Sequence, residues 1–279
     1  MRIRIIDAFT DRPFAGNPAA VCLLDMDTWP DESWMHRLAA ETNLPMTAFA
    51  YPLPPEAEAD WALRWFNPVI EESLCGHATL ATAHALQSDR GTPGTVRFST
   101  RSGVLVAHSE EDGTITLDFP TARVTEMPVP DGLPKALGAD PEATYSTGSL
   151  RDVLAVLPSE AAVRAVIPDF VALAHVTVRD GIRGVTITAE ASDPVRGYDF
   201  VSRFFSPADG LPEDPVTGSA HTALAPYWSD RLGRDDLTGL QVSARTGVVR
   251  TAVRGARVHL TGSAVTVLDG ILLDVAGPA

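Results

Sequence analysis

The stretch RFFSPADGLPEDPVTGSAHTALAPYW, residues 203–228, predicts a strand, a tight turn rich in Pro and Gly, and a helix that begins near Gly218. A second stretch, RWFNPVIEESLCGHATLATAHAL, begins at Arg64 and has the same order of residue types: arginine, aromatic, Phe, polar, Pro, a short turn, then Gly-x-Ala at the start of a helix. Arg64 and Arg203 lie 139 positions apart, half the length of the 279-residue chain. This spacing indicates an internal duplication, because solenoid repeats have periods of about 20–50 residues.

The remaining segments predict many strands and few helices, which is typical of the α+β class. We expect two similar domains, residues 1–118 and 125–265, with 266–279 able to return to the first domain. The Pro- and Gly-rich segment 119–142 is interpreted as a linker. In the second half, a helix is expected at about 159–166, and the following AHVTVRD, with its β-branched residues, is interpreted as a strand.

Each copy of the repeat places a glycine at the start of a helix, where unpaired backbone N–H groups can bind an anion. Gly76 and Gly218 are these glycines, and they let the backbone approach a ligand closely. Two such corners at one cleft would hold a small acidic molecule and present a proton-transferring group to each side of it. Arg64 and Arg203 are candidates to brace the corners through carboxylates.

Composition and charge argue against several classes of protein. The chain has 22 basic and 36 acidic residues and no basic stripe, which argues against a nucleic-acid partner. Two cysteines, Cys22 and Cys75, make no disulfide framework, which fits a reducing cytoplasm. The sequence has no run of about 18 apolar residues, so no membrane span is expected, and its N-terminus has no apolar segment of signal-peptide length.

Several segments together resemble the PhzF family, the phenazine biosynthesis-like proteins, over essentially the whole chain. They are DAFTDRPFAGNPAAV from residue 7, RWFNPVIEESLCGHAT from 64, EDPVTGSAH from 213 and QVSARTGVV from 241. The resemblance implies an α+β fold similar to diaminopimelate epimerase and proline racemase, with two pseudo-symmetric halves, each a mostly antiparallel barrel-like sheet around a central helix. It also implies a homodimer without metal or organic cofactor. The best-understood activity of the family is isomerisation of trans-2,3-dihydro-3-hydroxyanthranilate by proton transfer, and most members have no established substrate.

The resemblance also implies which residues act in the site. His77 and Asp214 are the expected proton-transferring groups, and Ser219 is expected to bind substrate together with Gly76 and Gly218. Each side chain has a structural alternative as well. His77 fits a packing role in a buried helix, Asp214 can favour the helix dipole, and Ser219 can be an ordinary first-turn serine.

The chain departs from the family pattern within ETNLPMTAF, residues 41–49. Met46 stands where the family has its principal acid/base Glu, and a thioether carries no proton at neutral pH. We therefore expect Met46 to line the substrate site of a PhzF-like isomerase acting on a small carboxylate-bearing metabolite. A non-catalytic binding protein and a lyase or cyclase using the same cleft are the alternatives. Thr217 stands opposite Cys75 in the repeat, which excludes a two-thiol racemase, and Cys75 is interpreted as a small buried residue.

Overall fold

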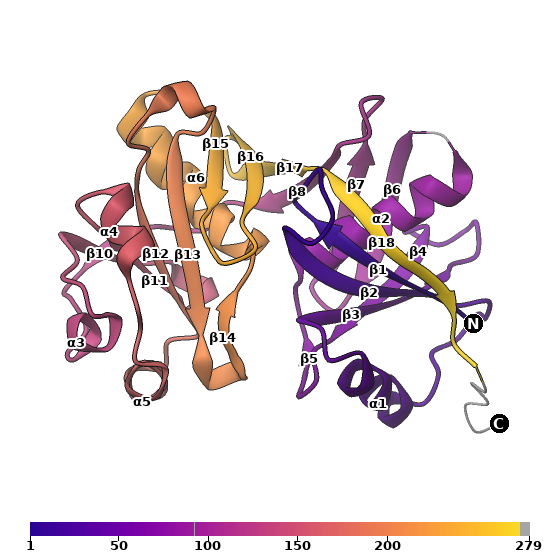
Figure 1. Cartoon of the computed structure of the whole chain (residues 1–279). Helices are drawn as coiled ribbons and strands as arrows, with labels where there is room; N and C mark the ends of the chain where they lie inside the picture. Colours follow the sequence, from indigo (N-terminus) through magenta and orange to yellow (C-terminus); the bar gives the residue numbers. More distant parts are fainter. Residues whose placement is uncertain (92, 274–279) are drawn as a thin grey trace. The chain divides into compact units, whose positions relative to one another are not determined.

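The computed structural model describes residues 1–91 and 93–273, in two compact units (Figure 1). The first unit contains Met1–Asp118 and the chain from Thr261 onward, and the second is Phe119–Leu260. The domains predicted from the sequence were residues 1–118 and 125–265. Residues 266–279 were expected to return to the first domain, and of these residues 274–279 lie outside the described residues.

In its described residues, the first unit is a sheet with two helices. Its helices are α1 (Glu32–Thr42) and α2 (Gly76–Arg90), and its strands are β1 (Arg2–Ala8), β2 (Asn17–Leu23), β3 (Met46–Pro52), β4 (Trp61–Phe66), β5 (Glu71–Glu72), β6 (Gly94–Thr100), β7 (Gly103–Ser109), β8 (Ile115–Pro120, which continues into the second unit) and β18 (Ala264–Ile271). Most neighbouring strands are antiparallel, whereas β2–β3 and β4–β6 are parallel.

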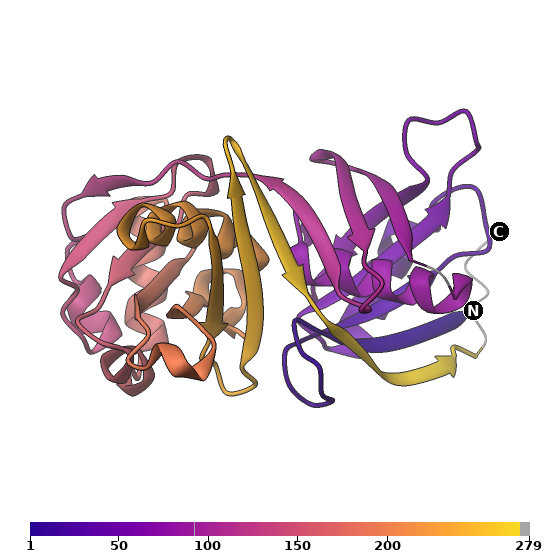
Figure 2. The ribbon, with the colours of Figure 1, turned by 90° about the horizontal axis from the view of Figure 1, so that it is seen from above.

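Helix α2 is the core of this unit. It contacts β1, β2, β3, β7 and β18, and Figure 2 shows strands on both sides of it. Its first eleven residues are buried except for His84, because alanines keep the helix narrow enough for the sheet to wrap around it. The buried hydroxyls of Thr79 and Thr82 donate to main-chain carbonyls one turn earlier, so burying them costs little folding free energy. Helix α1 packs on the opposite face of β3 and β4.

The second unit repeats this architecture. Its helices are α3 (Leu133–Leu137), α4 (Glu160–Ala165), α5 (Phe170–Asp180) and α6 (Gly218–Leu232), and its strands are β9 (Thr125–Met127), β10 (Ala143–Ser146), β11 (Val153–Val156), β12 (Val185–Glu190), β13 (Phe200–Ser206), β14 (Leu211–Asp214), β15 (Asp236–Gln241), β16 (Gly247–Arg254) and β17 (Arg257–Gly262, which continues into the first unit).

The strand pairing of the two units follows one scheme. In the first unit β2–β3 is parallel, β3–β4 and β4–β5 are antiparallel, β4–β6 is parallel and β6–β7 is antiparallel. Strands β11 to β16 pair in the same order and with the same directions. Helix α6 follows β14 as α2 follows β5. The α+β class and the duplicated architecture expected from the half-length repeat are therefore confirmed.

Two sequence-based predictions in the second unit are wrong. AHVTVRD belongs to helix α5, whose start is capped by the Asp169 carboxylate and whose end is marked by Gly181 in a left-handed conformation. Leu173 and Val176 are buried one turn apart, so helical packing outweighs the strand preference of the β-branched residues. The segment expected to be a plain linker, 119–142, contains β9 and α3.

Candidate active site

The corner before α6 is braced by an arginine. Arg203 donates through Nε and Nη2 to the two carboxylate oxygens of Glu213, at 2.7 and 2.9 Å, and through Nη1 to the carbonyl of Val166 at 2.7 Å. Its guanidinium also lies 5.0 Å from the ring centroid of Phe205. This bidentate pair fixes β14, which leads into the helix.

The corner before α2 has the same brace. Arg64 donates to both carboxylate oxygens of Glu71, at 2.7 and 2.6 Å, and lies 5.0 Å from the ring centroid of Phe66. The expected carboxylate partners of the two repeated arginines are therefore present. Glu32 adds a further acceptor for Arg64, at 2.6 Å.

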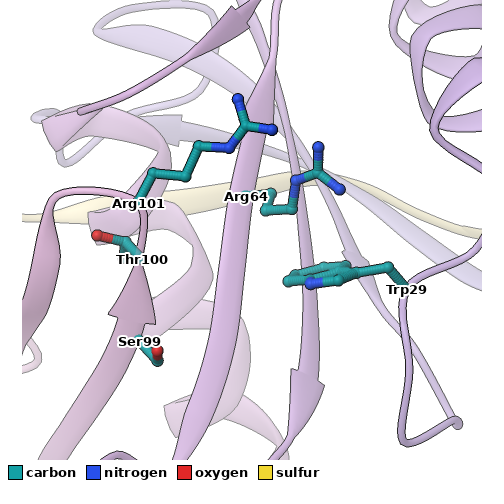
Figure 3. A pocket seen from close by; sticks show the side chains of 5 residues that line it. All are labelled: Trp29, Arg64, Ser99, Thr100 and Arg101. Atoms are coloured by element: carbon teal, nitrogen blue, oxygen red, sulfur yellow. The ribbon is translucent and has the colours of Figure 1, made fainter.

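Figure 3 shows a surface pocket beside this brace, lined by Trp29, Arg64, Ser99, Thr100 and Arg101. Its volume is about 340 Å³. The Trp29 ring lies 5.4 Å from the Arg64 guanidinium, and Arg101 reaches Glu71 at 2.8 Å. Because both arginines already pair with acids, this pocket has no excess positive charge, and its arginines serve as structural braces.

Asp214 ends β14 and is buried, with 5% of its surface exposed. Its Oδ2 accepts a hydrogen bond from Oγ1 of Thr217, the residue before α6, at 2.5 Å. Gln241 on β15 holds both residues in place. Its Nε2 donates to the main-chain carbonyl of Asp214 at 2.7 Å, and its Oε1 accepts from the Thr217 amide at 2.8 Å. The carboxylate is thus positioned at the N-terminal end of α6, beside Gly218.

Ser219 is half-buried in the first turn of α6. Its hydroxyl oxygen accepts a hydrogen bond from Arg183 Nη2 at 3.1 Å. Arg183 in turn makes a bidentate pair with Asp152, at 2.8 and 2.5 Å. Burial raises the pKa of the Asp152 carboxyl, and the neighbouring Arg183 opposes that rise. Ser219 therefore has a fixed donor, which leaves its own O–H available for a ligand.

His77 is the second residue of α2 and is 5% exposed. Its Nδ1 lies 3.5 Å from the Sγ of Cys75, and its buried Nε2 has no hydrogen-bond partner among the described residues. Burial lowers the pKa of His77 to about 3, so the imidazole is neutral at pH 7. A buried polar atom without a partner costs about 1–3 kcal/mol, which a ligand group bound to Nε2 would offset.

Met46 begins β3 and is 7% exposed. Ala48, two residues later, pairs with Trp65, so Met46 lies on the same face of the sheet as Trp65. The opposite face carries Phe49 and Phe66, which pack with α1. Met46 is therefore on the α2 face of its sheet.

The predicted site residues fall into two groups, one in each unit. We call Gly76, His77 and Met46 the first half-site and Asp214, Gly218 and Ser219 the second half-site. That both half-sites bind one ligand stays a prediction. Sequence reasoning missed Gln241 and Arg183 as positioning residues. Gln241 opens the QVSARTGVV segment that contributes to the family resemblance, whereas the sequence around Arg183 carries no comparable signal.

Residues 6–270 match the family model described as phenazine biosynthesis-like protein. The chain belongs to the PhzF family. It is 44% identical over 269 residues to an uncharacterized isomerase of Pseudomonas aeruginosa, with 96% of each chain covered. The crystal structure of a PhzF-family protein from Enterococcus faecalis is 38% identical and superposes with a TM-score of 0.85, over 96% of this chain and 97% of that one.

The PhzF fold extends to amino-acid epimerases. A hydroxyproline epimerase from Agrobacterium vitis, solved with bound trans-4-hydroxy-L-proline, has a TM-score of 0.61 at 13% identity, over 99% of this chain and 97% of that one. At this identity the likeness concerns the fold alone, and it agrees with the expected epimerase-like architecture. Among residues 1–91 and 93–273 of the PhzF-family chain, no helix is long and apolar enough to cross a membrane.

Proposed function

We propose that this PhzF-family protein is an isomerase that moves a proton within a small carboxylate-bearing metabolite. The observation that carries the proposal is the pair of helix starts, one with the buried carboxylate of Asp214 and the other with the buried neutral imidazole of His77. Relatives named as isomerases, in Pseudomonas aeruginosa and Halalkalibacterium halodurans, support the reaction class. We also expect a cytoplasmic homodimer.

Substrate binding uses the helix starts. The first N–H groups of α2 and α6, near Gly76 and Gly218, have no partner within their own helices and lie at the positive ends of the helix dipoles. They are suited to hold a substrate carboxylate. Ser219, whose oxygen already accepts from Arg183, donates its O–H to the same ligand.

Proton transfer starts at Asp214. Its carboxylate takes a proton from a substrate carbon, so that the C–H bond breaks as an O–H bond forms and the electron pair stays on the substrate. His77, neutral at pH 7, hydrogen-bonds through Nε2 to the substrate atom on which negative charge develops. In an alternative route, His77 takes the proton from Asp214 and gives it to the second carbon, so that an N–H bond breaks as the new C–H bond forms and the imidazole is neutral again. The net reaction moves one hydrogen and needs no oxidant or reductant.

Solvent deuterium tests this function. The protein is incubated in D₂O with trans-2,3-dihydro-3-hydroxyanthranilate, trans-4-hydroxy-L-proline or diaminopimelate, and carbon-bound deuterium is followed by NMR. We expect incorporation into at least one probe and a loss of about 10²–10⁴-fold in Asp214→Asn. Probes that bind by calorimetry without exchange would favour the binding protein, the alternative that Met46 supports because it cannot carry a proton.

A further inference from the structure

Glu72 occupies in the first unit the position that Asp214 occupies in the second. In the β4–β5 ladder Glu72 pairs with Trp65, and in the β13–β14 ladder Asp214 pairs with Phe204. Trp65 and Phe204 each follow the bracing arginine of their corner, and each acid stands four residues before the first residue of the helix. The register of the duplicated corner therefore relates the two carboxylates residue for residue.

The neighbouring acids have the opposite role in both corners. Glu71 and Glu213 bind the arginines Arg64 and Arg203. Because successive side chains of a strand point to opposite faces, Glu72 points away from the arginine brace, as Asp214 does. The two-residue strand β5 thus places Glu71 on the face of the arginine brace and Glu72 on the opposite face.

The face that Glu72 shares is the face of the first half-site. Phe66, which pairs with Glu71, packs with α1. Trp65 and Glu72 therefore lie on the other face, the α2 face, together with Met46. Phe204 behaves in the same way in the second unit, where it packs with α6.

Asn67 lies between Glu72 and the start of β3. Its Nδ2 donates to Glu72 Oε1 at 3.4 Å, while its Oδ1 accepts from the amides of Val69 and Ile70, each at 2.7 Å, which fixes the orientation of the amide group. Since Thr47 pairs with Phe66, Asn67 comes opposite Met46 in register. The half-buried carboxylate of Glu72 is thus held at the edge of the sheet where Met46 begins its strand.

We propose that Glu72 is a catalytic residue, the proton-transferring carboxylate of the first half-site. This inference rests on the proposed function. In its protonated form Glu72 gives its proton to the second substrate carbon, so that its O–H bond breaks as the new C–H bond forms. Asp214 meanwhile holds the proton taken from the first carbon. Both carboxyl groups then exchange with solvent, which restores the starting protonation states. Met46, at the same sheet edge, needs no titratable group in this scheme.

Glu72→Gln tests the assignment, because the amide keeps the shape of the side chain and cannot transfer the proton. The control is Glu56→Gln, which removes the same charge at an exposed loop position. Deuterium incorporation at the second carbon of the isomerised probe, the position that Glu72 would protonate, is measured for each protein, together with calorimetric Kd values and thermal unfolding. We expect a fall of about 10²–10⁴-fold in Glu72→Gln, with Kd and Tm close to wild type. Glu56→Gln should match wild type.

The outcomes separate this inference from the proposed function. Incorporation by wild type that survives unchanged in Glu72→Gln overturns the role of Glu72 and leaves the isomerase proposal standing. Probes that bind to wild type without exchange overturn both. A loss of exchange with a parallel loss of binding or folding in Glu72→Gln, but not in Glu56→Gln, assigns Glu72 a structural role and overturns the catalytic one.

Discussion

Arg203 and Glu213 form a bidentate pair that has a counterpart, Arg64 and Glu71, at the same place in the other unit. The surroundings of the two pairs differ, because Arg64 also donates to Glu32, whereas Arg203 also donates to the carbonyl of Val166. Glu71 has a second cation, Arg101, at 2.8 Å. The same arginine–glutamate pair thus holds both corners, and in the first corner Arg101 is a second cation that pairs with Glu71.

This difference predicts unequal effects of removing the arginines. Arg203→Met leaves Glu213, which is 20% exposed in its side chain, without its bidentate partner and should lower the free energy of unfolding by about 3–5 kcal/mol. Arg64→Met should cost less, because Arg101 still neutralises Glu71. Urea denaturation of both variants measures the difference, with Glu56→Gln as the control. Equal losses in the two variants would contradict this account of the corners.

Replacing Thr246 by glycine should stabilise the protein. It has φ of 55°, a left-handed conformation that is costly for a β-branched residue. The left-handed conformation costs a residue with a Cβ about 1–2 kcal/mol, and glycine removes this cost. Glycine also raises the entropy of the unfolded chain, which destabilises the folded protein by about 0.4–1 kcal/mol. Thr246→Gly should therefore raise the free energy of unfolding by roughly 0.5–1 kcal/mol. Thr246→Ala, which keeps a Cβ, should gain less. A loss in Thr246→Gly would show that the threonine stabilises its turn.

His77 predicts a loss of stability in acid. Its pKa is about 3 in the folded protein and near 6.5 when unfolded, so the unfolded state binds the proton more readily. The stabilisation is complete above pH 6.5 and is lost as the pH falls from 6.5 toward 3, by about 1.4 kcal/mol per pH unit. Between pH 7 and pH 5, wild type should lose about 2 kcal/mol more than His77→Asn. Parallel stability curves for the two proteins would contradict the burial of a neutral imidazole.

Met46→Glu should add a proton-transferring group to the first half-site. The side chain is 7% exposed and lies on the α2 face, so a carboxylate there is costly to bury and should lower Tm. Deuterium incorporation should rise, by up to about 10²–10⁴-fold if the remaining groups are in place. Met46→Gln is the matched control, with similar shape and no titratable group. A rate that rises equally in both variants would exclude proton transfer as the cause.

The half-length repeat in the sequence was sufficient to predict the α+β class and two similar domains, because a buried helix of small residues after a turn is specified locally. The α5 helix was mispredicted, since the burial of Leu173 and Val176 is a tertiary effect that AHVTVRD does not reveal. The site shows the same limit. His77, Asp214 and Ser219 were named from motifs, whereas Glu72 became a candidate only when strand register placed it opposite Trp65.

If one reaction uses a carboxylate from each unit, as we propose, Asp214 and Glu72 should be coupled in a double-mutant cycle on the rate of deuterium incorporation. Wild type, Asp214→Asn, Glu72→Gln and the double variant are compared with the same probe. Groups that serve one proton-transfer sequence are non-additive, so the double variant should be about as slow as the slower single variant. A double variant whose loss equals the product of the two single losses, or a Glu72→Gln rate equal to wild type, would contradict the claim.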